Sequence, residues 1–285
     1  MTAEFDLIDL VAEYVGRASA DTITGIGDDA AVLELASGEQ LVATMDTLNA
    51  GVHFDADADP YRLGHKSLAV NLSDLASMGA QPRWVLLSLS LPSSDAHWLR
   101  RFIRGFHDLA CRYGVQLVGG DTCSGPLSIT VTALGCATSG QTLLRSTARP
   151  GNLVVVSGVL GLAGYALRLL TNEEMPPNAA RDALDCPSPR VELGRALVGL
   201  ATACIDLSDG LIADLGHLAV ASGCGAEIEL SQLPVADEMR SLDPELRWDL
   251  QLGAGDDYEL CFTCPADRAD EVNRLAQELG LPLTV

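Results

Sequence analysis

The chain has 285 residues, with 39 acidic against 18 basic side chains and a formal charge of -21 at pH 7. A protein this negative repels nucleic acids, and it would bind phosphate-bearing ligands only with metal ions lying between. The apolar run at 153–167 is shorter than the roughly 20 residues that a membrane-spanning helix needs. We therefore expect neither a nucleic-acid partner nor a membrane partner.

The eight cysteines are scattered, and the first residues, Met1 to Glu4, carry no positive charge of the kind found in a secretory signal. Both features are typical of proteins from a reducing compartment. We expect a cytoplasmic protein.

The first half of the chain alternates between helix-like and strand-like segments. In chain order, the pattern predicts a helix (4–17), two strands (31–35 and 41–44), a long helix (60–78), a strand (84–91), a helix (97–113) and two strands (115–118 and 127–133). The strand at 41–44 would bring Asp46 to its end. The strand at 115–118 would lead into a glycine turn at 119–121.

The Ala-Arg-Pro-Gly segment at 148–151 is the best candidate for a domain boundary. Beyond it the pattern predicts a strand (153–157), a helix (163–170), a loop with four prolines, a helix (190–200), a strand (203–205), a helix (210–222), two strands (226–230 and 258–262) and a helix (268–279). Strands and helices are mixed in both halves, which predicts two α/β domains, 1–148 and 149–285.

Aspartates recur beside glycine, serine or threonine at the ends of apolar segments. The chain has too few cations to neutralise them all, and hard divalent cations such as Mg²⁺ prefer oxygen ligands while keeping positions for substrate phosphates. This pattern predicts a metal-dependent enzyme with a phosphorylated substrate. The aspartates concerned are Asp28, Asp29, Asp46, Asp74, Asp121, Asp206, Asp209, Asp256 and Asp257.

Each of these positions also has a simpler interpretation. Asp74 lies in an apolar helix, where a buried carboxylate needs a partner, and this would be a metal ion or an arginine such as Arg83. Gly120 and Asp121 follow an apolar strand, where they would approach a phosphate and a metal or form an ordinary turn.

The segment at 206–210, Asp-Leu-Ser-Asp-Gly, connects an apolar strand to an apolar helix. Ser208 or Asp209 would cap that helix, but capping leaves Asp206 without a role. His53 lies in a loop and is either a site residue or plain surface. Arg145 lies near the domain boundary, where its guanidinium would bind phosphate or pair with surface acids.

Taken together, six blocks in order resemble the thiamine-monophosphate kinases, which share a superfamily with aminoimidazole ribonucleotide synthetase and selenophosphate synthetase. The resemblance extends from about Phe5 to the last residue. The blocks are Gly-Ile-Gly-Asp-Asp (25–29), Asp-Thr-Leu with Gly-Val-His-Phe (46–54), His-Lys-Ser-Leu-Ala-Val-Asn-Leu-Ser-Asp-Leu-Ala (65–76), Gly-Gly-Asp-Thr (119–122), Ile-Asp-Leu-Ser-Asp-Gly-Leu (205–211) and Asp-Tyr-Glu-Leu (257–260).

The resemblance implies ATP-dependent phosphorylation of thiamine monophosphate, and a homodimer whose N-terminal domains form a shared barrel. The implied ligands of several Mg²⁺ ions are Asp29, Thr44, Asp46, Asp74, Asp121, Asp206 and Asp209. The implied ATP contacts are Gly120, Asp121, Arg145 and Ser208, and the implied substrate contacts are His53 and Asp256.

This chain departs from the family pattern at three places. Asp256 stands where a glutamate is common, Met45 stands where a threonine is frequent, and the family normally continues past Val285 with a segment that supplies an aromatic contact to thiamine. We expect the C-terminal domain to be shortened accordingly.

No pair of nucleophile and base is indicated, so we expect direct in-line transfer assisted by Mg²⁺, without a catalytic side chain. Two alternatives stay open from the sequence. One is another ATP-using enzyme of the same superfamily, and the other is a noncatalytic acidic metal-binding protein.

Overall fold

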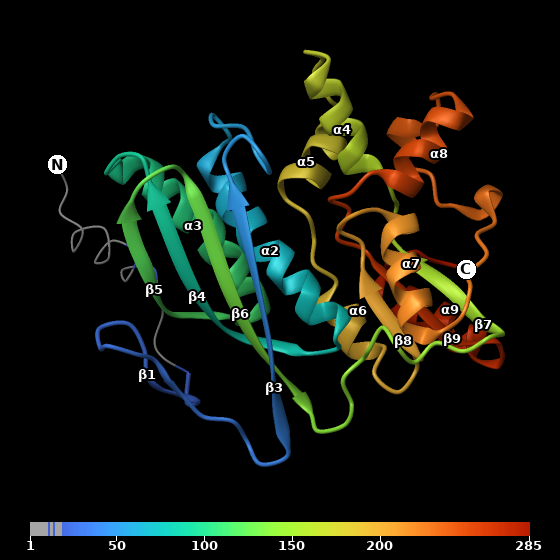
Figure 1. The fold of residues 1–285 in the computed structure, drawn as a ribbon, viewed down its shortest axis with the longest axis horizontal. Helices are drawn as coiled ribbons and strands as arrows, with labels where there is room; N and C mark the ends of the chain where they lie inside the picture. The colour runs from blue at the N-terminus through green and yellow to red at the C-terminus, as the bar shows by residue number, and fades with distance from the viewer. Residues whose placement is uncertain (1–10, 12–13, 15–18) are drawn as a thin grey trace. The chain divides into compact units, whose positions relative to one another are not determined.

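The computed structural model describes residues 11, 14 and 19–285. The chain divides into two compact units, unit 1 with residues 1–75 and 81–139 and unit 2 with residues 76–80 and 140–285. Each unit has a four-stranded sheet with helices packed on it, which is the mixed α/β architecture expected (Figure 1). The helix predicted over 4–17 lies outside the described residues, apart from positions 11 and 14.

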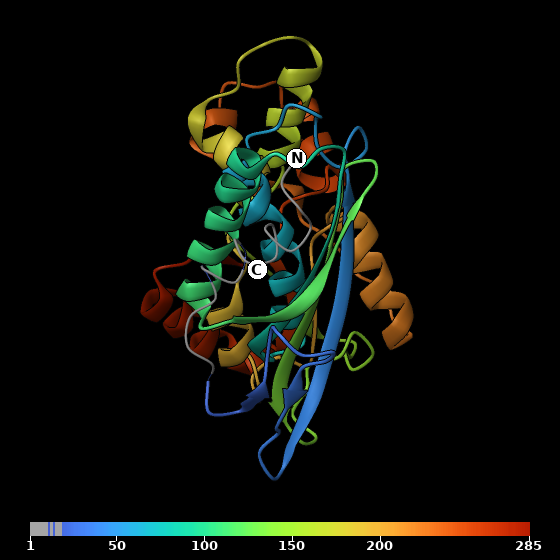
Figure 2. The ribbon, with the colours of Figure 1, turned by 90° about the vertical axis from the view of Figure 1, so that its left-hand side faces the viewer.

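The sheet of unit 1 has the strand order β3-β6-β4-β5, and the parallel pair is β4 with β5. Helices α2 and α3 cover one face of this sheet (Figure 2). The elements of this unit are β1 (Thr22–Thr24), β2 (Val32–Leu33), β3 (Glu39–Asn49), α2 (Pro60–Ser77), β4 (Gln81–Leu91), α3 (Ala96–Tyr113), β5 (Gln116–Ser124) and β6 (Ser128–Thr138).

Helix α3 forms where an apolar stripe lies between two clear end signals. Asp95 caps its first turn by accepting hydrogen bonds from the backbone N–H groups of His97 (2.8 Å) and Trp98 (3.1 Å). Gly114 ends the helix with a φ of 66°, a left-handed conformation that glycine adopts easily. Phe102 and Phe106, one turn apart, are fully buried.

Two expectations for unit 1 were wrong. β3 runs through Asn49, so Asp46 lies inside a long strand and not at its end. β5 continues to Ser124, so positions 119–121 form no turn. A Cβ on Gly120 would come within 1.8 Å of the Leu87 carbonyl oxygen in β4, so glycine is required there for close strand pairing.

The sheet of unit 2 is antiparallel throughout, with the order β10-β7-β9-β8. The strands are β7 (Asn152–Ser157), β8 (Ala203–Asp206), β9 (Leu260–Pro265) and β10 (Leu283–Thr284). The α-helices are α4 (Leu162–Thr171), α5 (Asn178–Asp185), α6 (Val191–Ala196), α7 (Leu211–Ser222), α8 (Pro244–Gly253) and α9 (Ala269–Leu279), and short 3-10 turns lie at η1 (Leu230–Gln232), η2 (Asp237–Met239) and η3 (Ala266–Arg268).

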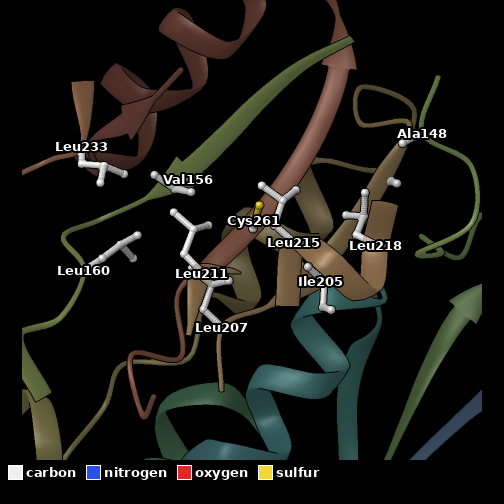
Figure 3. Close-up of a cluster of buried hydrophobic side chains, with 11 residues drawn as sticks. Ala148, Val156, Leu160, Ile205, Leu207, Leu211, Leu215, Leu218, Leu233 and Cys261 are labelled. Atoms are coloured by element: carbon white, nitrogen blue, oxygen red, sulfur yellow. The ribbon is translucent and has the colours of Figure 1, made fainter. Parts of the chain in front are cut away.

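The core of unit 2 forms where α7 packs on the sheet. Leu211 and Leu215 of α7 lie against Val156 of β7, Ile205 of β8 and Cys261 of β9 (Figure 3). Burial of these side chains anchors the start of α7 to the end of β8. The loop between them, which contains the Asp206–Gly210 motif, is therefore held at both of its ends.

Two expectations for unit 2 were also wrong, and one helix was not predicted. The proline loop contains helix α5, which follows Pro177. Helix α8, for which no element was predicted, begins at Pro244 after the capping residue Asp243. Proline fits the first turn of a helix because that turn leaves its N–H groups unused. The strand predicted at 226–230 is irregular and leads into η1.

Within the described part of the chain, no helix combines the length and apolar character needed to cross a membrane.

Candidate functional site

In unit 1, strand β3 and helix α2 bring two predicted metal ligands together. Thr44 and Asp46 are two residues apart in β3 and therefore point to the same face of the sheet. The Thr44 hydroxyl donates a hydrogen bond to the carboxylate of Asp74 in α2. Oxygen atoms of all three side chains thus belong to one half-buried group.

The electrostatics of this group favour a cation. Burial raises the pKa of Asp46 to about 6, the negative charge of Asp74 adds to the rise, and His53 opposes it. A carboxylate that is desolvated and faces a like charge resists ionisation. A divalent cation shared by Asp46 and Asp74 would relieve both penalties, and hard oxygen donors of this kind fit Mg²⁺.

His53 lies close enough to influence Asp46 and is held in place by its own loop. Its Nδ1 accepts a hydrogen bond of 3.0 Å from the backbone N–H of Asn49, the last residue of β3. The neutral ring therefore carries its proton on Nε2, which is left as a donor. The imidazole is exposed, as a side chain that contacts a substrate must be.

Asn71 of α2 is a site residue that sequence reasoning did not assign. Its side chain is fully buried, and its Oδ1 accepts a hydrogen bond of 3.1 Å from the backbone N–H of Asp46. The only local signal is its position three residues before Asp74, which places both side chains on the same side of the helix.

The remaining predicted residues of unit 1 are not joined to this group by hydrogen bonds among the described residues. Asp121 is exposed on β5, next to Gly120 and paired with Ser88 of β4. Asp29 is exposed, and its backbone N–H donates to the Asp28 carboxylate at 2.8 Å.

In unit 2, the loop after β8 and the segment before β9 are bound side by side. The backbone N–H of Asp256 donates to the Ser208 carbonyl (2.9 Å), and that of Tyr258 donates to the Leu207 carbonyl (2.8 Å). A Cβ on Gly255 would come within 2.3 Å of the Ser208 oxygen, so only glycine permits this approach. The predicted ATP contact Ser208 and the predicted substrate contact Asp256 are therefore neighbours.

Asp214, in the first turn of α7, is a second residue that sequence reasoning missed. Its buried carboxylate accepts a hydrogen bond of 3.0 Å from the backbone N–H of Asp209 and further backbone hydrogen bonds from Ser208 and Gly210. Burial nevertheless raises the pKa of Asp214. Asp214 thus holds the backbone of Asp209, whose own side chain is exposed. Asp206, at the end of β8, is by contrast only 4% exposed.

The backbone around Asp256 is in an unusual conformation. Asp256 and Tyr258 have φ angles of 67° and 49°, in the left-handed region that side chains other than glycine seldom adopt. Asp257 fixes the segment by accepting hydrogen bonds from the backbone N–H of Gly161 at 2.9 Å with both oxygens. Strain held by surrounding contacts is typical of functional sites.

Arg145 is exposed, and its backbone carbonyl accepts a hydrogen bond of 2.8 Å from the Ser222 hydroxyl. Within the described residues its guanidinium makes no ion pair or hydrogen bond.

The described side chains contain no group of three or more His, Cys, Asp or Glu residues that would hold a metal ion. Metal binding by Asp46 and Asp74 would therefore need further oxygen ligands from water or a phosphate.

Comparison with known proteins assigns both halves of the chain. Residues 27–137 match the family model of the AIR synthase related protein N-terminal domain, and residues 149–285 match that of the C-terminal domain. The chain is 44% identical to the thiamine-monophosphate kinase of Escherichia coli (strain K12) over 293 residues, which cover 99% of this chain and 88% of that protein. It is 36% identical to the thiamine-monophosphate kinase of Bacillus subtilis (strain 168), with 99% and 89% covered.

Solved structures agree with these matches. The crystal structure of thiamine-monophosphate kinase from Stenotrophomonas maltophilia K279a superimposes with a TM-score of 0.93 at 46% identity, covering 99% of this chain and 92% of that one. AaThiL complexed with AMPPCP and TMP superimposes with a TM-score of 0.78 at 32% identity, covering 99% and 88%.

Proposed function

Because this chain belongs to the thiamine-monophosphate kinase family, we propose that it transfers the γ-phosphoryl group of ATP to thiamine monophosphate and forms thiamine diphosphate. The observation that carries this proposal is the half-buried group of Thr44, Asp46 and Asp74, in which burial and the negative charge of Asp74 raise the pKa of Asp46 and a divalent cation would favour the ionised carboxylate. A relative complexed with AMPPCP and TMP supports the choice of both substrates.

We propose that residues of each unit bind Mg²⁺. Thr44, Asp46 and Asp74 would bind Mg²⁺ through their oxygen atoms, and Asp29 and Asp121 would add ligands in unit 1. In unit 2, Asp206 and Asp209 would bind further Mg²⁺ ions. When bound, Mg²⁺ supplies charge neutralisation and positioning for the phosphates.

The nucleotide would be held by Gly120, Asp121, Arg145 and Ser208. Gly120 is exposed and has no side chain that would keep a phosphate away from its backbone. The exposed Arg145 offers a planar cation to phosphate oxygens. His53 and Asp256 would contact thiamine monophosphate. The proton on Nε2 of His53 makes that atom a hydrogen-bond donor to the substrate.

The transfer would be direct and would need no catalytic side chain. An oxygen of the substrate phosphate forms the new bond to the γ-phosphorus while the bond from that phosphorus to the bridging oxygen breaks, and ADP leaves. A phosphate monoester has a second pKa of about 6, so its dianion needs no base at neutral pH. Binding and alignment by the chain's own residues are then the protein's contribution.

The exposed face of the unit 1 sheet supports a homodimer. Leu41 and Met45 on β3 are 51% and 63% exposed, on the face opposite to the one that α2 covers. We propose that this face pairs with the same face of a second copy and closes a barrel.

All eight cysteines are free thiols, which agrees with the cytoplasmic location that we propose. The functional division that we propose is 1–148 and 149–285.

The product and its stereochemistry test this function. Incubation with thiamine monophosphate, Mg²⁺ and ATP should yield thiamine diphosphate and ADP in equal amounts. ATP made chiral at the γ-phosphorus with oxygen isotopes should give product with inverted configuration, because a single in-line displacement inverts the centre. Retention would require a phosphorylated enzyme intermediate, and absence of thiamine diphosphate would contradict the assignment.

A further inference from the structure

Strand β3 lies at the edge of the unit 1 sheet, since the strand order is β3-β6-β4-β5. An edge strand has neighbours on one side only, so every second backbone N–H finds no partner in the sheet. The N–H of Asp46 is instead bound by Oδ1 of Asn71, at 3.1 Å. A side chain from α2 thus replaces the missing strand at the position of a proposed metal ligand.

The Asn71 amide is fixed at both of its polar ends. While Oδ1 accepts from Asp46, Nδ2 donates to the backbone carbonyl of Ser67, one turn earlier in α2, at 3.1 Å. The side chain is 0% exposed, so water cannot replace either partner. Rotation of the amide would break both hydrogen bonds in a buried place, which is costly.

Asn71 therefore links the two elements that carry the carboxylates. Asp46 comes from β3 and Asp74 from α2. Asn71 lies three residues before Asp74 in α2 and accepts a hydrogen bond from the backbone N–H of Asp46. The Thr44 hydroxyl, which donates to Asp74, is a second hydrogen-bonded link between these elements near the site. Asn71 bonds to the backbone N–H of Asp46, so its influence on the Asp46 carboxylate acts through backbone position.

We propose that Asn71 is a positioning residue of the metal site, which holds the Asp46 and Asp74 carboxylates at the separation that one divalent cation requires. It acts before any ligand binds and does not itself coordinate the cation. The inference rests on the proposed function, which assigns both aspartates to Mg²⁺. Groups that orient metal ligands typically contribute 10- to 100-fold to metal affinity.

Binding of Mn²⁺, measured by electron paramagnetic resonance on the full chain without nucleotide, tests this proposal. The site is identified as the binding that Asp74→Asn removes. Asn71→Leu keeps a similar size and loses both hydrogen bonds, so its dissociation constant for this site should rise at least about tenfold. Ser67→Ala is the matched control, because Ser67 is also buried in α2 and its hydroxyl donates to the Gly64 carbonyl of the same helix. The Mn²⁺ affinity of this variant should stay unchanged.

A merely structural role would have a different signature. It would lower the melting temperature of Asn71→Leu and leave the Mn²⁺ affinity at the wild-type value, and this result would overturn the proposal. Should Asn71→Leu fail to fold, hydrogen exchange on the wild-type protein replaces it. The metal-free Asp46 amide should then be strongly protected, and exchange at the unstructured rate would also overturn the proposal.

The two proposals fail in distinguishable ways. If the protein makes no thiamine diphosphate while Mn²⁺ affinity depends on Asn71 as predicted, the kinase assignment fails and the positioning role stands. If it makes thiamine diphosphate while Asn71→Leu binds Mn²⁺ like wild type, only the positioning role fails.

Discussion

The phenolic hydroxyl of Tyr258 donates a hydrogen bond of 3.0 Å to Oδ1 of Asp256, two residues earlier in the chain. Both residues have positive φ angles, and Tyr258 is 8% exposed. The carboxylate proposed to contact thiamine monophosphate is therefore oriented by a buried tyrosine.

Removal of that hydroxyl should weaken substrate binding selectively. In Tyr258→Phe the ring stays buried but the hydrogen bond, worth about 1 kcal/mol, is lost. We expect the KM for thiamine monophosphate to rise about fivefold, with the KM for ATP changed less than twofold. Steady-state kinetics with each substrate varied in turn measures both. Tyr165→Phe, at a half-buried tyrosine of α4, should have wild-type constants, and an equal rise in both KM values for Tyr258→Phe would remove this orienting role.

His53 should distinguish the substrates in the same direction. If its Nε2 donates to thiamine monophosphate, His53→Ala loses one hydrogen bond to a charged group, and we expect the KM for thiamine monophosphate to rise about tenfold. The same kinetic measurement on His97→Ala, at an exposed histidine of α3, should give no change. A parallel rise in the KM for ATP would exclude a specific substrate contact.

Asp46 should make metal binding and stability depend on pH. Its pKa of about 6 in the folded protein lies above the ordinary value of 3.8, so the folded metal-free state binds more protons than the unfolded state between these values. The stability contributed by protonated Asp46 is fully present below pH 3.8 and is lost as the pH rises through 6.

Urea unfolding without metal at pH 5 and pH 7.5 measures this contribution. The free energy of unfolding should fall more between the two pH values in wild type than in Asp46→Asn. Adding Mg²⁺ should restore wild-type stability at pH 7.5, and Mg²⁺ affinity should fall as the pH drops below 6, because protons compete for the same carboxylate. Asp57→Asn, at an exposed loop residue, should behave like wild type. Identical pH profiles for wild type and Asp46→Asn would contradict the buried-carboxylate explanation.

The exposed sheet face predicts a variant that separates the subunits. Met45→Glu places a charge on the apolar face of β3, where burial against a second copy would leave it unpaired. Light scattering should give a dimer mass for wild type and a monomer mass for Met45→Glu. Met175→Glu, at a loop methionine that is 91% exposed, is the control and should remain dimeric. A dimeric Met45→Glu would place the interface elsewhere.

Sequence patterns predicted the helices well where apolar periodicity met a clear stop. Helices α2 and α3 end within one residue of the predicted positions 78 and 113, because a left-handed glycine after an apolar stripe, here Gly79 and Gly114, is a local signal. Strand ends were less accurate. β5 passes straight through Gly119 and Gly120. Gly120 permits close pairing with β4, and this role is visible only once the two strands are paired in the sheet.

Some residues of the candidate site could likewise be predicted from local sequence, and others could not. Aspartates and glycines could be chosen from local motifs, and Thr44, Asp46 and Asp74 do come together. Asn71 and Asp214 could not be chosen, because their importance depends on backbone groups that only the folded chain brings to them, the N–H of Asp46 and the N–H groups at 208–210. Positioning residues leave little trace in local sequence for this reason.

Thiamine diphosphate formation measured against Mg²⁺ concentration, with wild type beside Asp74→Asn, tests the central claim that these carboxylates act through a divalent cation. We expect turnover by wild type to vanish without Mg²⁺ and saturate with it. Asp74→Asn, which keeps the shape of the side chain, should lose at least about 100-fold in kcat/KM while remaining folded. Turnover by wild type in the absence of divalent cations, or full activity of Asp74→Asn, would contradict the account.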